Sequence, residues 1–419
     1  MQIFLVLAIL LAPASAFAYL DPGSGAVLIN LIIAGFAALI YSFKNLLLRI
    51  LGKHNPQKHE EIIPDIAIFS EGKSYQHTFL PIVEALIFSK THFSYYSLEP
   101  EDPLLEIDND FCHNRFLGYG AMGRYRANNL PEPIVLSTTP NIGSPGYPVR
   151  RSPKIKNLVH VFHSVVDISM YRRGSLDSYD TVILPGDYHI HPIRVIEAVR
   201  GLKEKHLLSL GAPYLDVLLR DKELLIPETR PNCILVASSW GDKGLLKQYG
   251  IKPFVELTKG GFEVIIRPHP HSWKHEPELL RSLQKESSKS EGIVWDTALS
   301  PVGAMNRAAL MISDTSSVRF DFAFIYEKPV LSLEIPVEEM PGFERDDLEE
   351  IWSDHAALEI GRVISRKELE TQLEQHVTDT LAEFDAQRIR QFRDQTVLNF
   401  GHAGKAIADF LINFPKAKA

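Results

Sequence analysis

Five short β-rich runs between residues 233 and 333 decide the fold: Cys233-Ile-Leu-Val-Ala237, Phe262-Glu-Val-Ile-Ile266, Gly292-Ile-Val-Trp295, Ala309-Leu-Met-Ile312 and Pro329-Val-Leu-Ser332. Helical stretches separate each run from the next. Strands that alternate with helices predict a parallel sheet with crossover helices on both of its faces. Ligands of such sheets bind beyond the carboxyl ends of the strands, so the polar residues that follow each run are the first candidates for a site.

The same alternation precedes this region, in six further runs: Asp65-Ile-Ala-Ile-Phe-Ser70, Phe93-Ser-Tyr-Tyr-Ser97, Pro133-Ile-Val-Leu-Ser137, Leu158-Val-His-Val-Phe162, Thr181-Val-Ile-Leu184 and His206-Leu-Leu-Ser-Leu210. A charged, proline-containing break over residues 221–231 divides the two series. We therefore expect two doubly wound, Rossmann-like α/β domains, over residues 60–220 and 231–366. Residues 367–419 lack β-rich runs and predict a helical C-terminal tail.

The N-terminus contains two apolar runs that predict a membrane anchor. Residues 1–18 end in Ala-Phe-Ala, a small-x-small pattern, but no basic residue opens the run, so it is either a signal peptide or a first membrane segment. Residues 26–43 are long enough for a transmembrane helix, and an uncharged run of this length argues against the alternative of a buried hairpin. Basic residues follow it at Lys44, Arg49, Lys53 and Lys58. The positive-inside rule then places the chain at the inner (cytoplasmic) membrane, with the following domains facing the cytoplasm.

Composition excludes several classes of function. The net charge of −8 argues against nucleic-acid binding, because no basic excess exists to neutralise phosphates. The two cysteines, Cys112 and Cys233, lie far apart and predict neither a disulfide framework nor a zinc site. Glycine-rich phosphate loops are absent, and the single Asp-x-Asp triplet, Asp108-Asn-Asp110, lies away from the predicted strand ends. We expect no metal and no cofactor.

Two candidate phosphate-binding segments follow strands of the second domain. In Ile312-Ser-Asp-Thr-Ser-Ser-Val318, the residues Asp314, Thr315, Ser316 and Ser317 stand at a predicted helix start, where exposed amides and the helix dipole bind phosphate. N-capping alone explains the same residues equally well. In Ile266-Arg-Pro-His-Pro-His271, the prolines hold Arg267 and His269 rigidly, so that they can balance a diphosphate; a surface loop with incidental histidines is the alternative.

A third candidate follows a strand of the first domain, in Val159-His-Val-Phe-His-Ser164. His160 and His163 are three residues apart, so a strand points them to opposite faces and they do not share a metal. His163 lies at the strand end and is a candidate general base for a hydroxyl, whereas His160 is expected to be structural.

Taken in chain order, these motifs resemble those of the CDP-glycerol glycerophosphotransferase family, which builds teichoic-acid-like polymers. The matching segments are Phe162-His163, Gly211-Ala-Pro213-Tyr-Leu-Asp216, Val236-Ala-Ser-Ser-Trp240, Arg267-Pro-His269-Pro270 and Asp314-Thr-Ser316-Ser317 with Asp321 and Lys328-Pro329. The match covers residues 158–333. It departs from the family pattern at Phe162 in place of Trp, Ser164 in place of Gly and Thr315 in place of Tyr.

The resemblance implies a two-domain GT-B architecture and transfer of glycerol phosphate, or a related polyol phosphate, from a CDP-activated donor to a membrane-linked acceptor. It implies that His163 and His269 are catalytic: His163 is the base, and His269 contacts the donor phosphates and assists departure of CMP. It also implies that Asp314, Ser316 and Ser317 hold the phosphate groups. Two other readings remain. One is a GT-B glycosyltransferase or sugar-nucleotide epimerase that uses a UDP-sugar. The other is a non-catalytic membrane platform that retains the fold.

Overall fold

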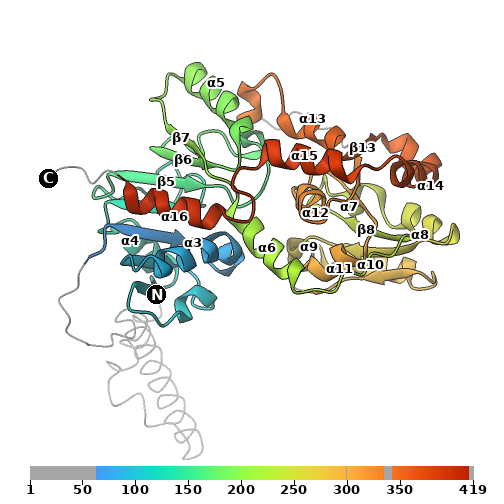
Figure 1. The fold of residues 1–419 in the computed structure, drawn as a ribbon, viewed down its shortest axis with the longest axis horizontal. Coiled ribbons are helices and arrows are strands. Elements are labelled where there is room, and N and C mark those ends of the chain that lie inside the picture. The colour runs from blue at the N-terminus through green and yellow to red at the C-terminus, as the bar shows by residue number, and fades with distance from the viewer. Residues whose placement is uncertain (1–62, 299, 335–341, 415–419) are drawn as a thin grey trace, which may run out of the picture. The chain divides into compact units, whose positions relative to one another are not determined.

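The computed structural model describes residues 63–298, 300–334 and 342–414, which fold around two parallel β-sheets (Figure 1). The seven-stranded sheet has the order β3-β2-β1-β4-β5-β6-β7 and the six-stranded sheet the order β10-β9-β8-β11-β12-β13. In the first sheet the strands are β1 Ile66–Ser70, β2 Phe93–Ser97, β3 Cys112–Phe116, β4 Ile134–Ser137, β5 Asn157–Val161, β6 Thr181–Leu184 and β7 His206–Ser209. In the second they are β8 Cys233–Ala237, β9 Glu263–Arg267, β10 Ile293–Trp295, β11 Leu310–Ser313, β12 Val330–Leu333 and β13 Gly361–Ile364.

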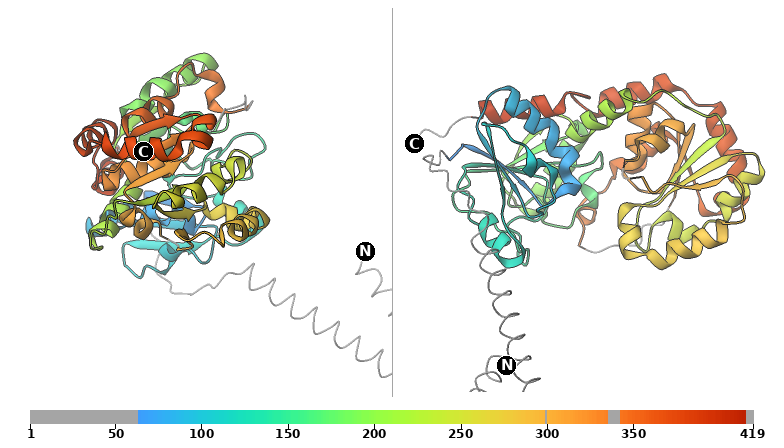
Figure 2. Two further views of the ribbon diagram at one scale, coloured as in Figure 1. Left: turned by 90° about the vertical axis from the view of Figure 1, so that its right-hand side faces the viewer. Right: turned by 90° about the horizontal axis from the view of Figure 1, so that it is seen from below.

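Helices cover both faces of each sheet (Figure 2). The first sheet is accompanied by α3 Gln76–Phe88, α4 Gly120–Ala127, α5 Ile190–Arg200 and α6 Pro213–Glu223. The second is accompanied by α7 Leu245–Tyr249, α8 Lys252–Lys259, α9 Pro270–His275, α10 Pro277–Ser287, α11 Val302–Arg307, α12 Val318–Tyr326, α13 Trp352–Glu359, α14 Arg366–Ala382 and α15 Ala386–Thr396. The last helix, α16 Ala403–Asn413, packs on the first sheet. The prediction of two doubly wound parallel-sheet domains is therefore confirmed. In both sheets the strand order reverses beside the first strand, between β1 and β4 and between β8 and β11. Such switch points are where doubly wound folds bind ligands.

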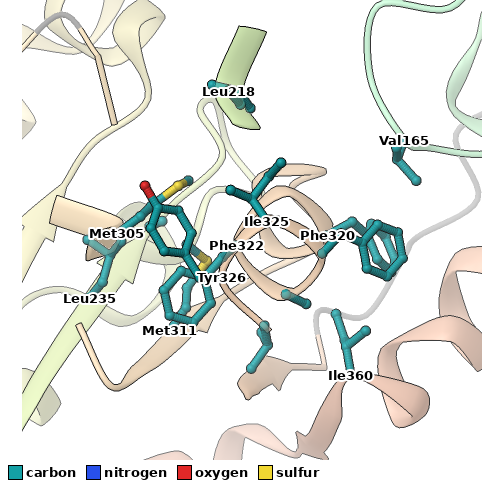
Figure 3. Close-up of a cluster of buried hydrophobic side chains, with 14 of the residues drawn as sticks. Val165, Leu218, Leu235, Met305, Met311, Phe320, Phe322, Ile325, Tyr326 and Ile360 are labelled. Carbon is teal, nitrogen blue, oxygen red and sulfur yellow. The ribbon is translucent and has the colours of Figure 1, made fainter. Parts of the chain in front are cut away.

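Alternating side chains of each central strand supply two separate cores. In β8, Leu235 joins the cluster that contains α12, whereas Ile234 and Val236 face the cluster on the other side of the sheet. Helix α12 is buried on nearly all sides. Its Phe320 and Phe322 belong to one cluster with Met311 of β11 and with Val165, which lies in the loop after β5 of the first sheet (Figure 3). The cluster around α12 therefore joins residues of both sheets into one unit.

Two strands, β3 and β13, were not expected from the sequence. Both lie at an edge of their sheet, and their sequences, Cys-His-Asn-Arg-Phe and Gly-Arg-Val-Ile, are only partly buried. An edge strand is open on one side and is protected by polar side chains, so it lacks the apolar run by which the central strands are recognised.

The helical tail divides between the two sheets. Residues Leu369, Leu373 and Val377 of α14 pack on the second sheet. Beyond α15, the chain returns to the first sheet, where Ile407 and Leu411 of α16 join its core and α16 lies beside α3 (Figure 1).

The two predicted N-terminal membrane segments, residues 1–18 and 26–43, lie outside the described residues and remain predictions. Within residues 63–298, 300–334 and 342–414, the structure contains no helix that is both long and apolar enough to cross a membrane.

Candidate active site at the carboxyl ends of the strands

The candidate phosphate-binding residues of the second domain follow three neighbouring strands. Ser239 and Trp240 follow β8, His269 follows β9, and the segment 314–317 follows β11. Because β8 pairs in parallel with both β9 and β11, these three loops emerge at the same edge of the sheet. The structure thus places both candidate phosphate-binding segments, the one with His269 and the one at 314–317, at the same edge of the sheet.

Asp314 connects two of these loops. Its carboxylate is fully buried, and Oδ2 accepts hydrogen bonds from the backbone and the hydroxyl of Ser239 (both 2.8 Å) and from the Leu245 amide (2.9 Å). Oδ1 accepts from the Ser316 amide at 2.9 Å. Burial raises the pKa of the Asp314 carboxyl, against the lowering effect of these bonds. The side chain therefore fixes the loops after β8 and β11 with respect to each other.

The hydroxyls that follow Asp314 do not cap α12. Ser317 occupies the N-cap position without a side-chain hydrogen bond, and the half-buried Thr315, Ser316 and Ser317 hydroxyls have no hydrogen-bond partner among the described residues. The backbone amides of Thr315, Ser317 and Val318 likewise find no acceptor in the part of the chain that the structure describes. This segment offers hydroxyl and amide donors at the positive end of the helix dipole, as an anion site requires.

Arg319 lies in the first turn of the same helix and is 4% exposed. One terminal nitrogen donates to the Ser353 carbonyl at 3.0 Å, while Nε has no hydrogen-bond partner among the described residues. Burial lowers the pKa of this guanidinium, although the negative charges of Asp314, Asp354 and Asp167 raise it in part. The sequence analysis did not single out Arg319, because nothing in its local pattern distinguishes it from a surface arginine.

Arg267 forms an ion pair. It is the last residue of β9, and its guanidinium contacts Asp296, which follows the neighbouring β10, at 2.5 Å. Both side chains are 11% exposed. The pair ties the ends of β9 and β10 together and holds the loop that carries His269.

His269 caps α9 through its ring. The His271 amide donates to Nδ1 of His269 at 3.1 Å, which assigns the proton of the neutral ring to Nε2. Burial, with a contribution from His271, lowers the pKa of the His269 imidazole to about 4. At neutral pH the ring is therefore an uncharged hydrogen-bond donor.

An array of rings adjoins His269. Trp240 lies with its ring centroid 5.1 Å from that of His271, 5.6 Å from His275 and 6.4 Å from His269, at interplanar angles of 34°, 30° and 28°. The Trp240 side chain is 47% exposed. The nearly parallel planes leave an aromatic surface beside His269, in one of the candidate phosphate-binding segments. His271 and His275 join it through the short helix α9, which the sequence analysis did not predict.

His163 follows β5 of the first sheet. Its Nδ1 lies 3.1 Å from the hydroxyl of Thr138, which follows the adjacent β4, and its ring meets that of Tyr75 edge to face at 5.4 Å. Burial lowers the pKa of the His163 imidazole to about 4. Its neighbour in sequence, His160, is fully buried, with Nε2 3.2 Å from the Tyr171 hydroxyl.

A hydrogen-bonded chain links the loop of His163 to the second domain. The amide of Val165 donates to the Tyr214 hydroxyl at 3.0 Å, and that hydroxyl donates to Oδ1 of Asp321 on α12 at 2.5 Å. Burial raises the pKa of Asp321 to about 7, although the Tyr214 bond lowers it. The segment after His163 is therefore joined through Tyr214 to α12, the helix that begins after Ser317.

No three His, Cys, Asp or Glu side chains converge as metal ligands would, within the residues that the structure describes. The described residues at these strand ends supply imidazoles, hydroxyls, backbone amides and arginines, together with the carboxylates of Asp296 and Asp314.

Comparison with solved structures identifies proteins that share this fold. Two structures of the wall teichoic acid polymerase TagF, a His-to-Asn variant soaked with CDP-glycerol, match with TM-scores of 0.53 and 0.54, at 15% and 16% identity. Each match covers 91% of this chain and 97% of the other. The chain has the fold of TagF. This agrees with the family resemblance of the motifs.

Enzymes of another class share the fold equally well. The UDP-GlcNAc 2-epimerases of Methanocaldococcus jannaschii, in complex with UDP-GlcNAc and UDP, and of Neisseria meningitidis, bound to UDP-GlcNAc, both match with a TM-score of 0.53 at 14% identity. Each match covers 83% of this chain and 99% of the other. No protein-family model matches the chain, and no curated protein matches its sequence. The comparisons therefore establish the fold, and the reaction must be argued from the site.

Proposed function

We propose that the protein transfers glycerol phosphate, or a related polyol phosphate, from a CDP-activated donor to a hydroxyl of a membrane-associated acceptor in cell-envelope polymer synthesis. One observation carries the proposal. A neutral imidazole at the end of β5, held through Nδ1 by Thr138, is linked by Val165, Tyr214 and Asp321 to a helix start with unpartnered hydroxyls and amides. Transfer of a phosphoryl group to a hydroxyl requires a base for the hydroxyl proton and hydrogen-bond donors that hold the anionic phosphate. Here the base follows one sheet and the hydrogen-bond donors follow the other.

In the proposed reaction the acceptor oxygen attacks the β-phosphorus of the donor. The bond between that phosphorus and the bridging oxygen breaks, and CMP leaves with the electron pair. The acceptor proton passes to Nε2 of His163, which has no hydrogen-bond partner among the described residues. In-line displacement of this kind depends mainly on positioning and on stabilising charge on the phosphate oxygens.

The low pKa of the His163 imidazole, about 4, has a consequence for this step. A ring that resists protonation is a weak base in the free protein. The negative charge of a bound diphosphate favours the protonated imidazole and raises its pKa. The base therefore becomes effective when the donor is in place.

The donor-side residues divide into two roles. Thr315, Ser316, Ser317 and the Nε2 proton of His269 are assigned to the diphosphate as hydrogen-bond donors. Asp314 and Arg267 are assigned to positioning, because the carboxylate already accepts four hydrogen bonds and the guanidinium already pairs with Asp296.

Membrane attachment is part of the proposal and rests on the sequence. The apolar run 26–43 and the basic residues after it, Lys44 to Lys58, support an anchor with the catalytic domains on the cytoplasmic side. Nucleotide-activated donors are made there, and an anchored enzyme meets an acceptor that is itself in the membrane.

A UDP-sugar reaction is the competing function, and the fold shared with UDP-GlcNAc 2-epimerases supports it. Purified full-length protein is to be offered CDP-glycerol or UDP-GlcNAc in the presence of membrane vesicles. CMP release, UDP release and conversion of UDP-GlcNAc to its epimer are measured. We expect CMP release from CDP-glycerol that depends on the vesicles. Conversion of UDP-GlcNAc alone would overturn the proposal in favour of the competitor, and no turnover of either donor would favour a binding platform.

A further inference from the structure

Two adjoining cavities lie in the first domain, outside the residues assigned to the reaction. Their volumes are about 720 and 810 Å³, and they share a wall formed by residues 143–147 and Ser178. Volumes in this range accommodate an organic ligand rather than a few waters. Nothing in the proposed reaction has so far used them.

Arginines are the most numerous charged residues among the described lining residues. Arg172, Arg173 and Arg200 line the first cavity, and Arg124, Arg150 and Arg151 line the second. The only acidic residue among the described lining residues of either cavity is Asp177. The cavities therefore favour an anion.

Three of these arginines are neutralised by the protein. Arg173 pairs with Asp347 at 2.8 Å, Arg200 with Asp347 at 2.6 Å, and Arg151 with Asp180 at 2.7 Å. The other three are exposed, and their guanidinium groups have no hydrogen bond or ion pair among the described residues: Arg124, Arg150 and Arg172. A guanidinium presents paired N–H donors that match the oxygens of a phosphate.

The wall that the two cavities share is a glycine-containing loop, whose backbone a ligand can approach closely. Asn141, Gly143 and Gly146 have positive φ angles of 67°, 82° and 80°. A Cβ at Gly146 would meet nothing within 4 Å, and the Gly146 amide has no acceptor among the described backbone groups. The loop thus carries a backbone amide without an acceptor in the described backbone and leaves space at the Cα of Gly146.

The cavities lie on the same sheet edge as His163. Tyr147 of the shared wall donates from its hydroxyl to Oε1 of Glu71 at 2.7 Å, and Glu71 directly follows β1. Tyr75, a few residues further, contacts His163. Strands β1, β4 and β5 are parallel neighbours, so the loops that carry Glu71, Tyr147 and His163 leave the sheet together.

One exposed aromatic side chain, Tyr125 of α4, lines the second cavity, and two further exposed apolar side chains precede it in the sequence. Tyr119, Met122 and Tyr125 on and before α4 are 56%, 38% and 65% exposed, and Tyr125 lines the cavity with Arg124. Arginines next to exposed aromatic residues suit a ligand in which a phosphate adjoins an apolar part, as at a membrane interface.

We propose that these cavities bind the phosphate-bearing part of a lipid-linked acceptor, with Arg124 and Arg150 in one cavity and Arg172 in the adjoining one as the donors to phosphate oxygens. The site would hold a phosphomonoester or phosphodiester and present a nearby hydroxyl of the same molecule to His163. The inference rests on the proposed function only in taking the ligand to be the acceptor.

Binding to the full-length protein in non-ionic detergent tests the site. The probes are dihexanoyl phosphatidic acid, a soluble phosphate lipid, and inorganic phosphate, each titrated by calorimetry. The variant R124Q/R150Q/R172Q removes the three free arginines. Its matched control, R281Q/R366Q/R388Q, removes the same charge from exposed arginines of the second domain and tail.

We expect the cavity variant, whose replaced arginines are unpaired among the described residues, to keep its melting temperature and to bind the lipid about tenfold more weakly or worse. The control should bind the lipid like the wild type. Equal weakening in both variants would show charge attraction alone and overturn the site. Inorganic phosphate that binds the wild type as tightly as the lipid does would overturn the lipid-linked ligand.

Turnover separates this inference from the proposed function. In CMP-release assays the cavity variant should raise KM for the acceptor and leave KM for CDP-glycerol unchanged. Lipid binding that depends on the cavity without any CMP release would contradict the proposed function alone. CMP release with an unaltered acceptor KM would contradict this inference alone.

Discussion

At the scale of single residues, the functional assignments depend on which polar groups the protein leaves without partners. The Asp314 carboxylate accepts four hydrogen bonds from other residues of the protein, and the Arg267 guanidinium forms an ion pair with Asp296. His163 is held on one side only, by Thr138. A side chain fixed through one atom and open at another is suited to act on a ligand, whereas a fully bonded one is suited to orient its neighbours.

Replacing His163 by Ala should lower kcat for CMP release by roughly 10²- to 10⁴-fold, the range expected for loss of a general base. Thr138→Val should lower kcat less, by about tenfold, because the ring remains but is no longer oriented. His191→Ala, an exposed histidine on α5, is the control and should leave kcat unchanged. A His163→Ala variant as active as the control would remove this residue from the reaction.

The pH dependence of kcat/KM provides a second test of His163. Because burial lowers the pKa of the free imidazole to about 4, the ring stays unprotonated as the pH falls from 8 to about 5. We therefore expect no loss of kcat/KM from this group until the pH approaches 4. A fall centred near the ordinary histidine value of about 6.5 would show that the base has a normal pKa and contradict the buried geometry.

Asp321 should make the fold less stable as the pH rises. Burial raises its pKa to about 7 in the folded protein, so between pH 4 and 7 the folded state keeps a proton that the unfolded state releases. Above about pH 7 the carboxyl is ionised in both states, and the loss of stability does not grow further. Asp321→Asn keeps an acceptor for Tyr214 and removes this loss, so its stability relative to wild type should grow by roughly 2–4 kcal/mol across this range. Denaturant titrations at several pH values measure it, and a constant difference would contradict the raised pKa.

At the scale of elements, the sequence predicted what is buried better than what is exposed. The central strands carry apolar runs because both of their faces are covered, and all of them were predicted within a residue or two. The edge strands β3 and β13 carry polar residues and were missed. The candidate site follows the same logic. The candidate residues were recognised from the sequence, but their hydrogen-bond partners were not. Those partners lie far away in the chain: 25 positions for His163, 29 for Arg267 and 107 for Asp321, and no local pattern encodes such separations.

The return of α16 to the first sheet predicts a sensitive glycine. A Cβ at Gly404, the second residue of α16, would lie 2.3 Å from Cβ of Pro81 in α3, so Gly404→Ala should destabilise the protein by about 1–3 kcal/mol. Gly303 is the second residue of α11, where a Cβ meets nothing within 4 Å. Gly303→Ala should therefore be neutral or stabilise by up to about 1 kcal/mol. Equal effects of the two substitutions in thermal unfolding would show that α16 does not pack tightly on α3.

At the scale of the whole molecule, the two sheets are joined by polar contacts as well as by the core around α12. Tyr188 and Trp352 stack at 3.9 Å, Asp167 accepts from the Ser353 amide at 2.9 Å, and Arg200 contacts both Glu344 and Asp347. These contacts hold the segment 342–354 of the second domain against loops of the first. The geometry between the His163 loop and α12 depends on them.

Arg200→Leu should therefore weaken both stability and turnover. It leaves the carboxylate of Glu344, whose side chain is 2% exposed, without its charge partner, and leaves Asp347, which is 7% exposed, paired with Arg173 alone. We expect a loss of about 3–5 kcal/mol in the free energy of unfolding. Arg388→Leu, which breaks an exposed pair with Glu359, should cost about 1 kcal/mol or less. Similar losses in the two variants, measured by chemical denaturation, would argue against a buried junction.

The transfer of label from CDP-[¹⁴C]glycerol to membrane acceptor tests the central claim most directly. With full-length protein and membrane vesicles, we expect label to appear in the membrane fraction, with one CMP released for each glycerol transferred, and to be lost with His163→Ala. CMP released without label in the membrane, or labelling that survives His163→Ala, would contradict an account in which His163 directs an acceptor hydroxyl to the donor held at the start of α12.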